Sequence, residues 1–117
     1  MVRGIASVLV YVRDMAASAD FYGRLLGVPA EGGDATITQF SVGTLRLVLH
    51  RDRTTPARAG VAGAMEFDIE VGDIATFRSE LAGRGIAAPE PRQQPWGWTG
   101  FSLHDPDGNV VEVYEIP

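Results

Sequence analysis

Two glutamates, Glu66 and Glu112, are the residues of this sequence whose type and spacing point most directly to chemistry. Glu66 opens the alternating stretch EFDIEV, and Glu112 stands in VVEVYE, three residues after the turn sequence DPDGN. If both carboxylates enter one dry cleft, their repulsion should raise the pKa of at least one, giving a candidate general acid or base. With His50 added, they match the composition of a site for one divalent metal ion. Because both stretches alternate polar and apolar residues, each glutamate is equally compatible with the wet face of a strand.

Aromatic residues form a second candidate site. The segment QPWGWTGF places Trp96 and Trp98 on a loop rich in proline and glycine, just before the last predicted hairpin. Two indoles are costly to expose and serve well as flat walls of a pocket, to which Tyr114 on the last strand would add a third ring. The alternative is that one tryptophan only covers the core. A cationic, planar or glycopeptide-like ligand would suit aromatic walls in an acidic protein.

Composition narrows the class of protein and the class of site. The 117 residues, 45% hydrophobic and 21% charged, are typical of one globular domain. A formal charge of −5, with all ten positive charges carried by scattered arginines, argues against nucleic acid as a partner. The absence of cysteine leaves only His, Asp, Glu or hydroxyl ligands for any metal. No apolar run is long enough for a membrane span or a signal sequence, so we expect a cytoplasmic protein without a membrane partner.

The chain contains the same pattern twice. Val12 and Asp14 recur as Val71 and Asp73, each 59 positions later, and TQFSV is repeated as TGFSL. Each copy predicts a strand, then a helix capped by its aspartate, and then three antiparallel strands. The apolar stripes of the helices are expected at Met15, Ala19, Tyr22 and Leu26 and at Ile74, Phe77 and Leu81.

We therefore predict an α+β fold of two tandem β-α-β-β-β modules, residues 1–55 and 64–117, within a single domain, 1–117. They would form a curved mixed sheet around a cleft. Gly27 and the pair Gly83 and Gly85 should end the helices, and DPDG should form the last hairpin's turn. Segment 51–63 is expected to be a linker and segment 89–95 a shorter loop. Matching the two copies places four positions on one inner ring: Ser7, Val48, Glu66 and Glu112.

The motifs VRDMAASADFY, FYGRLLG and DPDGNVVEV, within a duplicated unit, resemble the vicinal oxygen chelate superfamily. It is also called the glyoxalase/bleomycin resistance protein/dioxygenase superfamily. The resemblance covers nearly the whole chain and implies the paired β-α-β-β-β fold. Metal-dependent members use four inner-ring ligands, which here fall on Ser7, Val48, Glu66 and Glu112. Only Glu112 keeps its usual identity, because serine is a poor ligand and valine is none. His50 lies two residues from Val48, about 6 to 7 Å along a strand, which argues against its recruitment.

The leading hypothesis is metal-independent binding of a small molecule, including antibiotic-like ligands, with no cofactor. Trp96, Trp98 and Tyr114 would wall the cleft, and Glu66 and Glu112 would supply polar contacts beside Ser7 and His50. The resemblance implies that the loop carrying Trp96 lines the ligand groove and that the protein is a homodimer. One alternative is a lyase, isomerase or dioxygenase acting on vicinal oxygens, with Glu112, Glu66 and His50 holding Fe, Mn, Ni or Zn. The other alternative is a non-catalytic interaction domain.

Overall fold

The computed structural model describes residues 1–51 and 65–117. It divides the chain into two compact units, Met1–Val61 and Ala62–Pro117. All of the predicted linker except Arg51 lies outside the described residues. None of the helices in the described part is long and apolar enough to cross a membrane.

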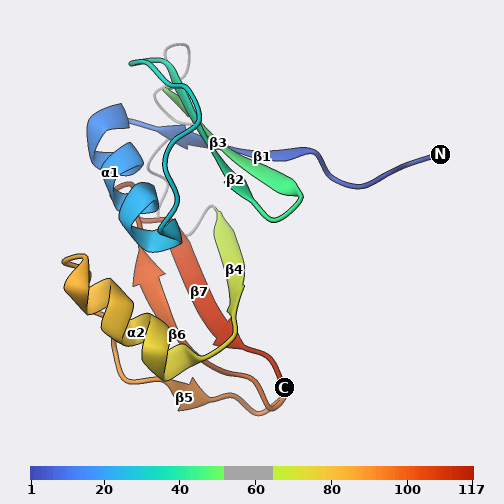
Figure 1. The fold of residues 1–117 in the computed structure, drawn as a ribbon, viewed down its shortest axis with the longest axis vertical. Helices are drawn as coiled ribbons and strands as arrows, with labels where there is room; N and C mark the ends of the chain where they lie inside the picture. The colour runs from blue at the N-terminus through green and yellow to red at the C-terminus, as the bar shows by residue number, and fades with distance from the viewer. Residues whose placement is uncertain (52–64) are drawn as a thin grey trace. The chain divides into compact units, whose positions relative to one another are not determined.

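The first unit is a three-stranded mixed sheet covered on one face by a helix (Figure 1). Its elements are β1 (Ser7–Val12), α1 (Met15–Leu26), β2 (Ile37–Val42) and β3 (Leu45–Arg51). The sheet order is β1-β3-β2, with β1 parallel and β2 antiparallel to the central strand. Residues of β1, α1, β2 and β3 that point between sheet and helix form the core, namely Val10, Val12, Tyr22, Leu25, Phe40 and Leu49.

The ends of α1 follow the sequence signals. Asp14 is the N-cap and accepts a hydrogen bond from the Ala17 N–H at 3.2 Å. Gly27 ends the helix with φ of 67°, the left-handed conformation that glycine adopts without strain. The predicted buried stripe was partly wrong, because Ser18 and Leu25 are buried in place of Ala19 and Leu26. Both stripes have helical spacing, and contact with the sheet selects between them.

The second unit is a four-stranded mixed sheet with its own helix on one face (Figure 1). Its elements are β4 (Glu66–Val71), α2 (Ile74–Gly83), β5 (Arg92–Gln93), β6 (Thr99–His104) and β7 (Val110–Glu115). The sheet order is β4-β7-β6-β5, and β4 is parallel to β7. The segment expected to be a loop, 89–95, contains the short edge strand β5.

The internal duplication extends to the pairing of individual residues. Val12 lies opposite Arg51 in the first sheet as Val71 lies opposite Glu115 in the second. Even β5 has a counterpart, since the isolated bridge of Gly33 to Thr38 matches the pair of Gln93 and Thr99. The predicted α+β class is therefore confirmed, as two mixed sheets with a helix each. The second unit has the predicted element order, whereas in the first unit the strand expected directly after the helix is reduced to this isolated bridge. The cleft expected from the two modules stays a prediction.

Candidate functional site

One face of the second sheet collects most of the side chains that the sequence singled out. Side chains alternate along strands, and residues paired in register share a face. The face opposite α2, called here the acidic face, carries residues from four strands: Glu66, Asp68 and Glu70 of β4, Arg92 of β5, Gly100, Ser102 and His104 of β6, and Val110, Glu112 and Tyr114 of β7. The structure thus brings Glu66, Glu112 and Tyr114 onto one surface.

Trp96, Trp98 and Tyr114 form a cluster of three rings at one end of this face. Trp98 and Tyr114 have centroids 5.3 Å apart, while Trp96 lies 6.5 Å from Trp98 and 6.3 Å from Tyr114. All three contacts are edge-to-face, the geometry that the quadrupoles of aromatic rings favour. Trp96 remains 59% exposed although Tyr114 is buried, so the cluster offers an indole surface on a rigid base.

Glu112 is held in place by two hydroxyl groups. The Ser102 hydroxyl donates a hydrogen bond to Glu112 Oε1 at 2.7 Å, from the position directly opposite on β6. The Tyr114 side chain also hydrogen-bonds to Glu112. Burial raises the pKa of Tyr114, and the carboxylates of Glu112, Asp68 and Glu66 raise it further, so the phenol keeps its proton. The result is an oriented carboxylate directly beside an aromatic cluster.

Glu66 belongs to the same acidic network through Asp68. The pKa of Glu66 is raised from 4.5, first by loss of hydration and then by the charges of Asp68 and Glu112. A side-chain hydrogen bond to Asp68 adds to this shift, because it favours the protonated form of Glu66. The acidic face therefore concentrates negative charge that a cation would relieve.

Gly100 explains why Tyr114 can lie flat against β6. A Cβ placed on Gly100 would come within 2.5 Å of Tyr114 Cδ1 and would collide with the backbone carbonyl of Val113. Gly100 faces Tyr114 in register, so the missing side chain leaves the space that the phenol ring occupies. Sequence reasoning missed Gly100, although a glycine inside a predicted strand is a signal of close approach.

Asp68 and Ser102 were also missed. Asp68 alternates with Glu66 along EFDIEV, so the period of a strand already placed it on the same face. Ser102 has no comparable signal, because its role depends on its register with Glu112 across the hairpin.

The other predicted site residues lie in the first unit. Ser7 is exposed at the start of β1, and Val48 is buried in β3 on the sheet face opposite α1. His50 shares that face and contacts the Tyr11 ring edge-on, with centroids 5.7 Å apart. Its Nδ1 is buried and has no hydrogen-bond partner among residues 1–51 and 65–117. It stays a prediction that these residues of the first unit join Glu66 and Glu112 in one site.

The residues at the family's four metal positions do not fit a metal. Val48 has no donor atom, Ser7 offers only a neutral hydroxyl, and Glu112 is already engaged by Ser102. Within the described ranges, no group of three or more His, Asp or Glu residues is arranged to hold an ion.

The comparisons with known proteins agree with this architecture. The chain's fold is similar to that of a bleomycin-binding protein solved in complex with bleomycin, with a TM-score of 0.76 and 24% identity over 99% of this chain and 100% of the other. The fold is also similar to that of a bleomycin resistance determinant encoded on the transposon Tn5. Here the TM-score is 0.74 and the sequence identity is 26%, over 96% of this chain and 97% of the other. For lactoylglutathione lyase from Agrobacterium tumefaciens, the TM-score is 0.76 and the sequence identity is 22%, over 98% of this chain and 95% of the other.

Comparison of the sequence with protein-family models identifies the family of this chain. No curated protein matches the chain in sequence. The model of the Glyoxalase/Bleomycin resistance protein/Dioxygenase superfamily matches residues 4–113, nearly the whole chain. This chain therefore belongs to the glyoxalase/bleomycin resistance protein/dioxygenase superfamily.

Proposed function

We propose that this protein binds a cationic small molecule with a planar group on the acidic face of its second sheet, without a metal. The observation that carries the proposal is the contact between the three-ring cluster and the fixed carboxylate of Glu112. A planar group would stack on the indoles, and an amine or guanidinium would lie against the carboxylates.

The electrostatics of the face favour such a ligand. Glu66, Asp68 and Glu112 lie close enough to one another to raise the pKa of Glu66. A bound cation would offset this repulsion, so part of the binding free energy would come from relief of unfavourable interactions in the free protein. An anionic ligand would instead be repelled by these carboxylates.

Two relatives support the class of ligand. One structural neighbour was solved with bleomycin bound, and another is a bleomycin resistance determinant. The same fold also occurs in a lactoylglutathione lyase, so the fold alone does not decide between binding and catalysis. The residues of the acidic face favour binding, because they supply flat walls and charge but no set of metal ligands. The homodimer and the cytoplasmic location expected from the sequence stay predictions.

Isothermal titration calorimetry tests the proposal with two probes, metal-free bleomycin and a simple planar organic cation. Wild-type protein should bind at least one of them, and Glu112→Gln should weaken binding about tenfold, because a charged hydrogen-bonding group is lost. Glu31→Gln is the matched control, since it removes the same charge from an exposed position in the first unit. Absence of binding by wild type, or an equal loss in both variants, would refute the proposal.

The titration should be repeated with a chelator and with added Fe, Mn, Ni or Zn. We expect the affinity of the planar cation to be the same in all cases. An affinity that requires one of these ions would instead favour the metal-dependent alternative.

A further inference from the structure

The acidic face has a positive charge at one edge, because Arg92 lies there on β5. Arg92 is paired with Gly100 of β6, and Gly100 is paired with Tyr114 of β7. Tyr114 is paired in its turn with Glu70 of β4. Residues paired in register share a face, so the four residues form one row across the sheet. The row carries a carboxylate on one outer strand and a guanidinium on the other.

An aromatic surface lies between these two charged edges. The Tyr114 ring occupies the space that Gly100 leaves, since a Cβ on Gly100 would come within 2.5 Å of Tyr114 Cδ1. Trp96 and Trp98 contact this ring from the loop that joins β5 to β6. The hairpin that carries both tryptophans therefore also carries Arg92, on the face where the rings lie.

Hydrogen bonds tie Arg92 to the loop that carries the tryptophans. The side-chain amide of Gln94 donates to the Arg92 carbonyl at 3.2 Å, and the Gln94 N–H donates to the Trp98 carbonyl at 2.7 Å. The backbone that bears the guanidinium and the backbone that bears the rings are thus parts of one hydrogen-bonded hairpin.

The charge of Arg92 is available to a ligand. Arg92 is exposed, and it forms no ion pair with any residue of 1–51 or 65–117. The acidic residue nearest to it in sequence, Glu90, is paired instead with Arg78 of α2 at 3.1 Å. A negative group of a bound molecule would therefore not have to displace a partner from the guanidinium.

The spacing of the strands indicates the length of a ligand that would reach both charges. Neighbouring strands are about 4.8 Å apart, so β5 lies about 10 Å from β7, which carries Glu112, and about 14 Å from β4. The three-ring cluster lies within this interval. A planar body of two fused rings with one charged group at each end suits the distance, because the arginine and glutamate side chains are long enough to adjust to it.

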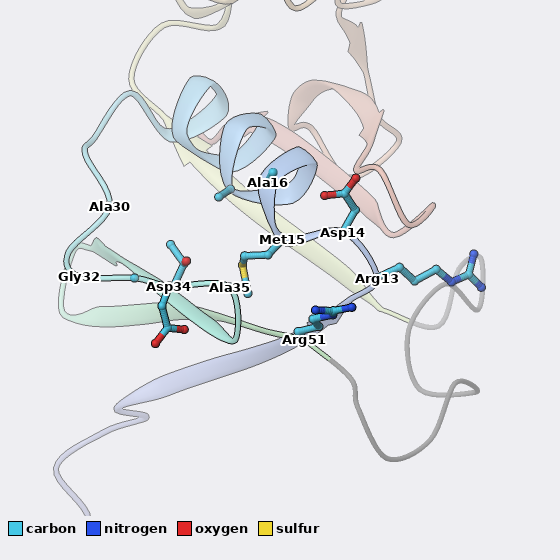
Figure 2. Close-up of a pocket in the computed structure, with 12 residues that line it drawn as sticks. Arg13, Asp14, Met15, Ala16, Ala30, Gly32, Asp34, Ala35 and Arg51 are labelled. Atoms are coloured by element: carbon cyan, nitrogen blue, oxygen red, sulfur yellow. The ribbon is translucent and has the colours of Figure 1, made fainter.

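The pocket in the first unit does not share these properties. It has a volume of about 980 Å³ and lies beside the first turn of α1 (Figure 2). Its charged lining consists of two arginines and two aspartates, Arg13, Arg51, Asp14 and Asp34. None of the described residues that line it is aromatic. Of the two places, the acidic face is therefore the one that combines an aromatic surface with separated charges.

We propose that Arg92 selects, among the planar cations that bind the acidic face, those with a carboxylate at the end opposite the cation. This inference rests on the proposed function, which places the cation at Glu112 and the planar body on the three-ring cluster. The carboxylate would accept hydrogen bonds from the guanidinium, whose planar set of donors matches its two oxygens. The preferred ligand is thus a zwitterion, and Arg92 repels a second positive charge at that end.

Isothermal titration calorimetry with two matched probes tests this selectivity. The probes are 2-amidinonaphthalene, a planar cation, and 6-amidino-2-naphthoate, which adds a carboxylate at the far end of the rings. Wild-type protein should bind the zwitterion about tenfold more tightly, because a charged hydrogen bond is gained. Arg92→Gln should remove this preference without weakening the binding of the plain cation. Arg92→Glu should reverse the order of the two affinities.

Arg84→Gln is the matched control, because it removes the same charge from the end of α2, on the other face of the sheet. It should keep the tenfold preference. Equal affinities of wild type for the two probes, a preference that persists in Arg92→Gln, or an equal loss of preference in Arg84→Gln would overturn the inference and leave the proposed function intact. If wild type bound neither probe, the proposed function would fail, and this inference with it.

Discussion

Asp105 is a buried carboxylate that accepts hydrogen bonds within the turn that contains it. Its Oδ1 accepts from the N–H groups of Asp107 and Asn109, and its Oδ2 accepts from the Asn109 side chain. Gly108 completes the turn with φ of 86°. The sequence predicted this structural role, because DPDG supplies a proline and a glycine where the turn needs them. This turn also sets the register of the hairpin, which places Ser102 opposite Glu112.

Replacing Asp105 should therefore cost stability. Asp105→Ala leaves buried N–H groups without an acceptor, and we expect a loss of about 2 to 3 kcal/mol in the free energy of unfolding. Asp105→Asn should cost less, because one oxygen remains. Urea unfolding measures both, with Pro106→Ala at the exposed neighbouring position as the control. Equal stability of Asp105→Ala and wild type would contradict this assignment.

The raised pKa of Glu66 makes a prediction about pH. Its pKa lies above the 4.5 of the unfolded chain, so the folded protein binds the proton more tightly. The ionised side chain therefore lowers stability at neutral pH, and this penalty disappears as pH falls through the raised pKa and below 4.5. Glu66→Gln should raise the Tm at pH 7 and leave little difference from wild type at pH 4.

The control for this prediction is Glu31→Gln, which removes one exposed negative charge from the first unit. A Tm difference between Glu66→Gln and wild type that is the same at both pH values would show that the effect is not due to ionisation. A lower Tm at pH 7 would show that Glu66 stabilises the fold.

At the scale of elements, β6 and β7 are matched through Gly100 and Tyr114. Gly100→Ala would press a methyl group against the phenol ring and the Val113 carbonyl. We expect a loss of about 1 to 3 kcal/mol in the free energy of unfolding, because this is the usual cost of overpacking a core. The displaced ring should also weaken binding of the planar cation. Urea unfolding and calorimetry measure the two effects.

Gly83→Ala is a matched control for that substitution. No atom lies within 4 Å of the Cβ that it would add at the end of α2. Alanine favours helix, so this change should be neutral or slightly stabilising. If both variants had the same stability, the close approach of Gly100 to Tyr114 would not matter energetically.

The elements were largely predictable, and the exceptions have physical causes. Asp14 and Asp73 mark the helix starts, and alternating apolar residues mark β1 and β4. The buried stripe of α1 could not be fixed, because Ser18 is buried by its neighbours rather than by its own hydrophobicity. The strand β5 escaped notice because two residues carry no periodic pattern.

At the scale of the whole molecule, duplication followed by divergence accounts for the distribution of chemistry. Equivalent positions carry Ser7 and Glu66, Val48 and Glu112, and Arg51 and Glu115. The sequence alone revealed the first two of these pairs and hence the surface of the candidate site. It could not reveal the hydrogen bond from Ser102 to Glu112, because that bond depends on the register of the hairpin formed by β6 and β7.

The central claim, that a planar cation binds beside Glu112, is tested most directly by tryptophan fluorescence. The chain has two tryptophans, and both belong to the three-ring cluster, so the signal comes from the site itself. Titration with metal-free bleomycin and with a simple planar cation, corrected for probe absorption, should give a saturable change that Glu112→Gln weakens about tenfold. Glu31→Gln should leave it unaltered. No change with either probe, or the same curve for Glu112→Gln and wild type, would contradict the claim.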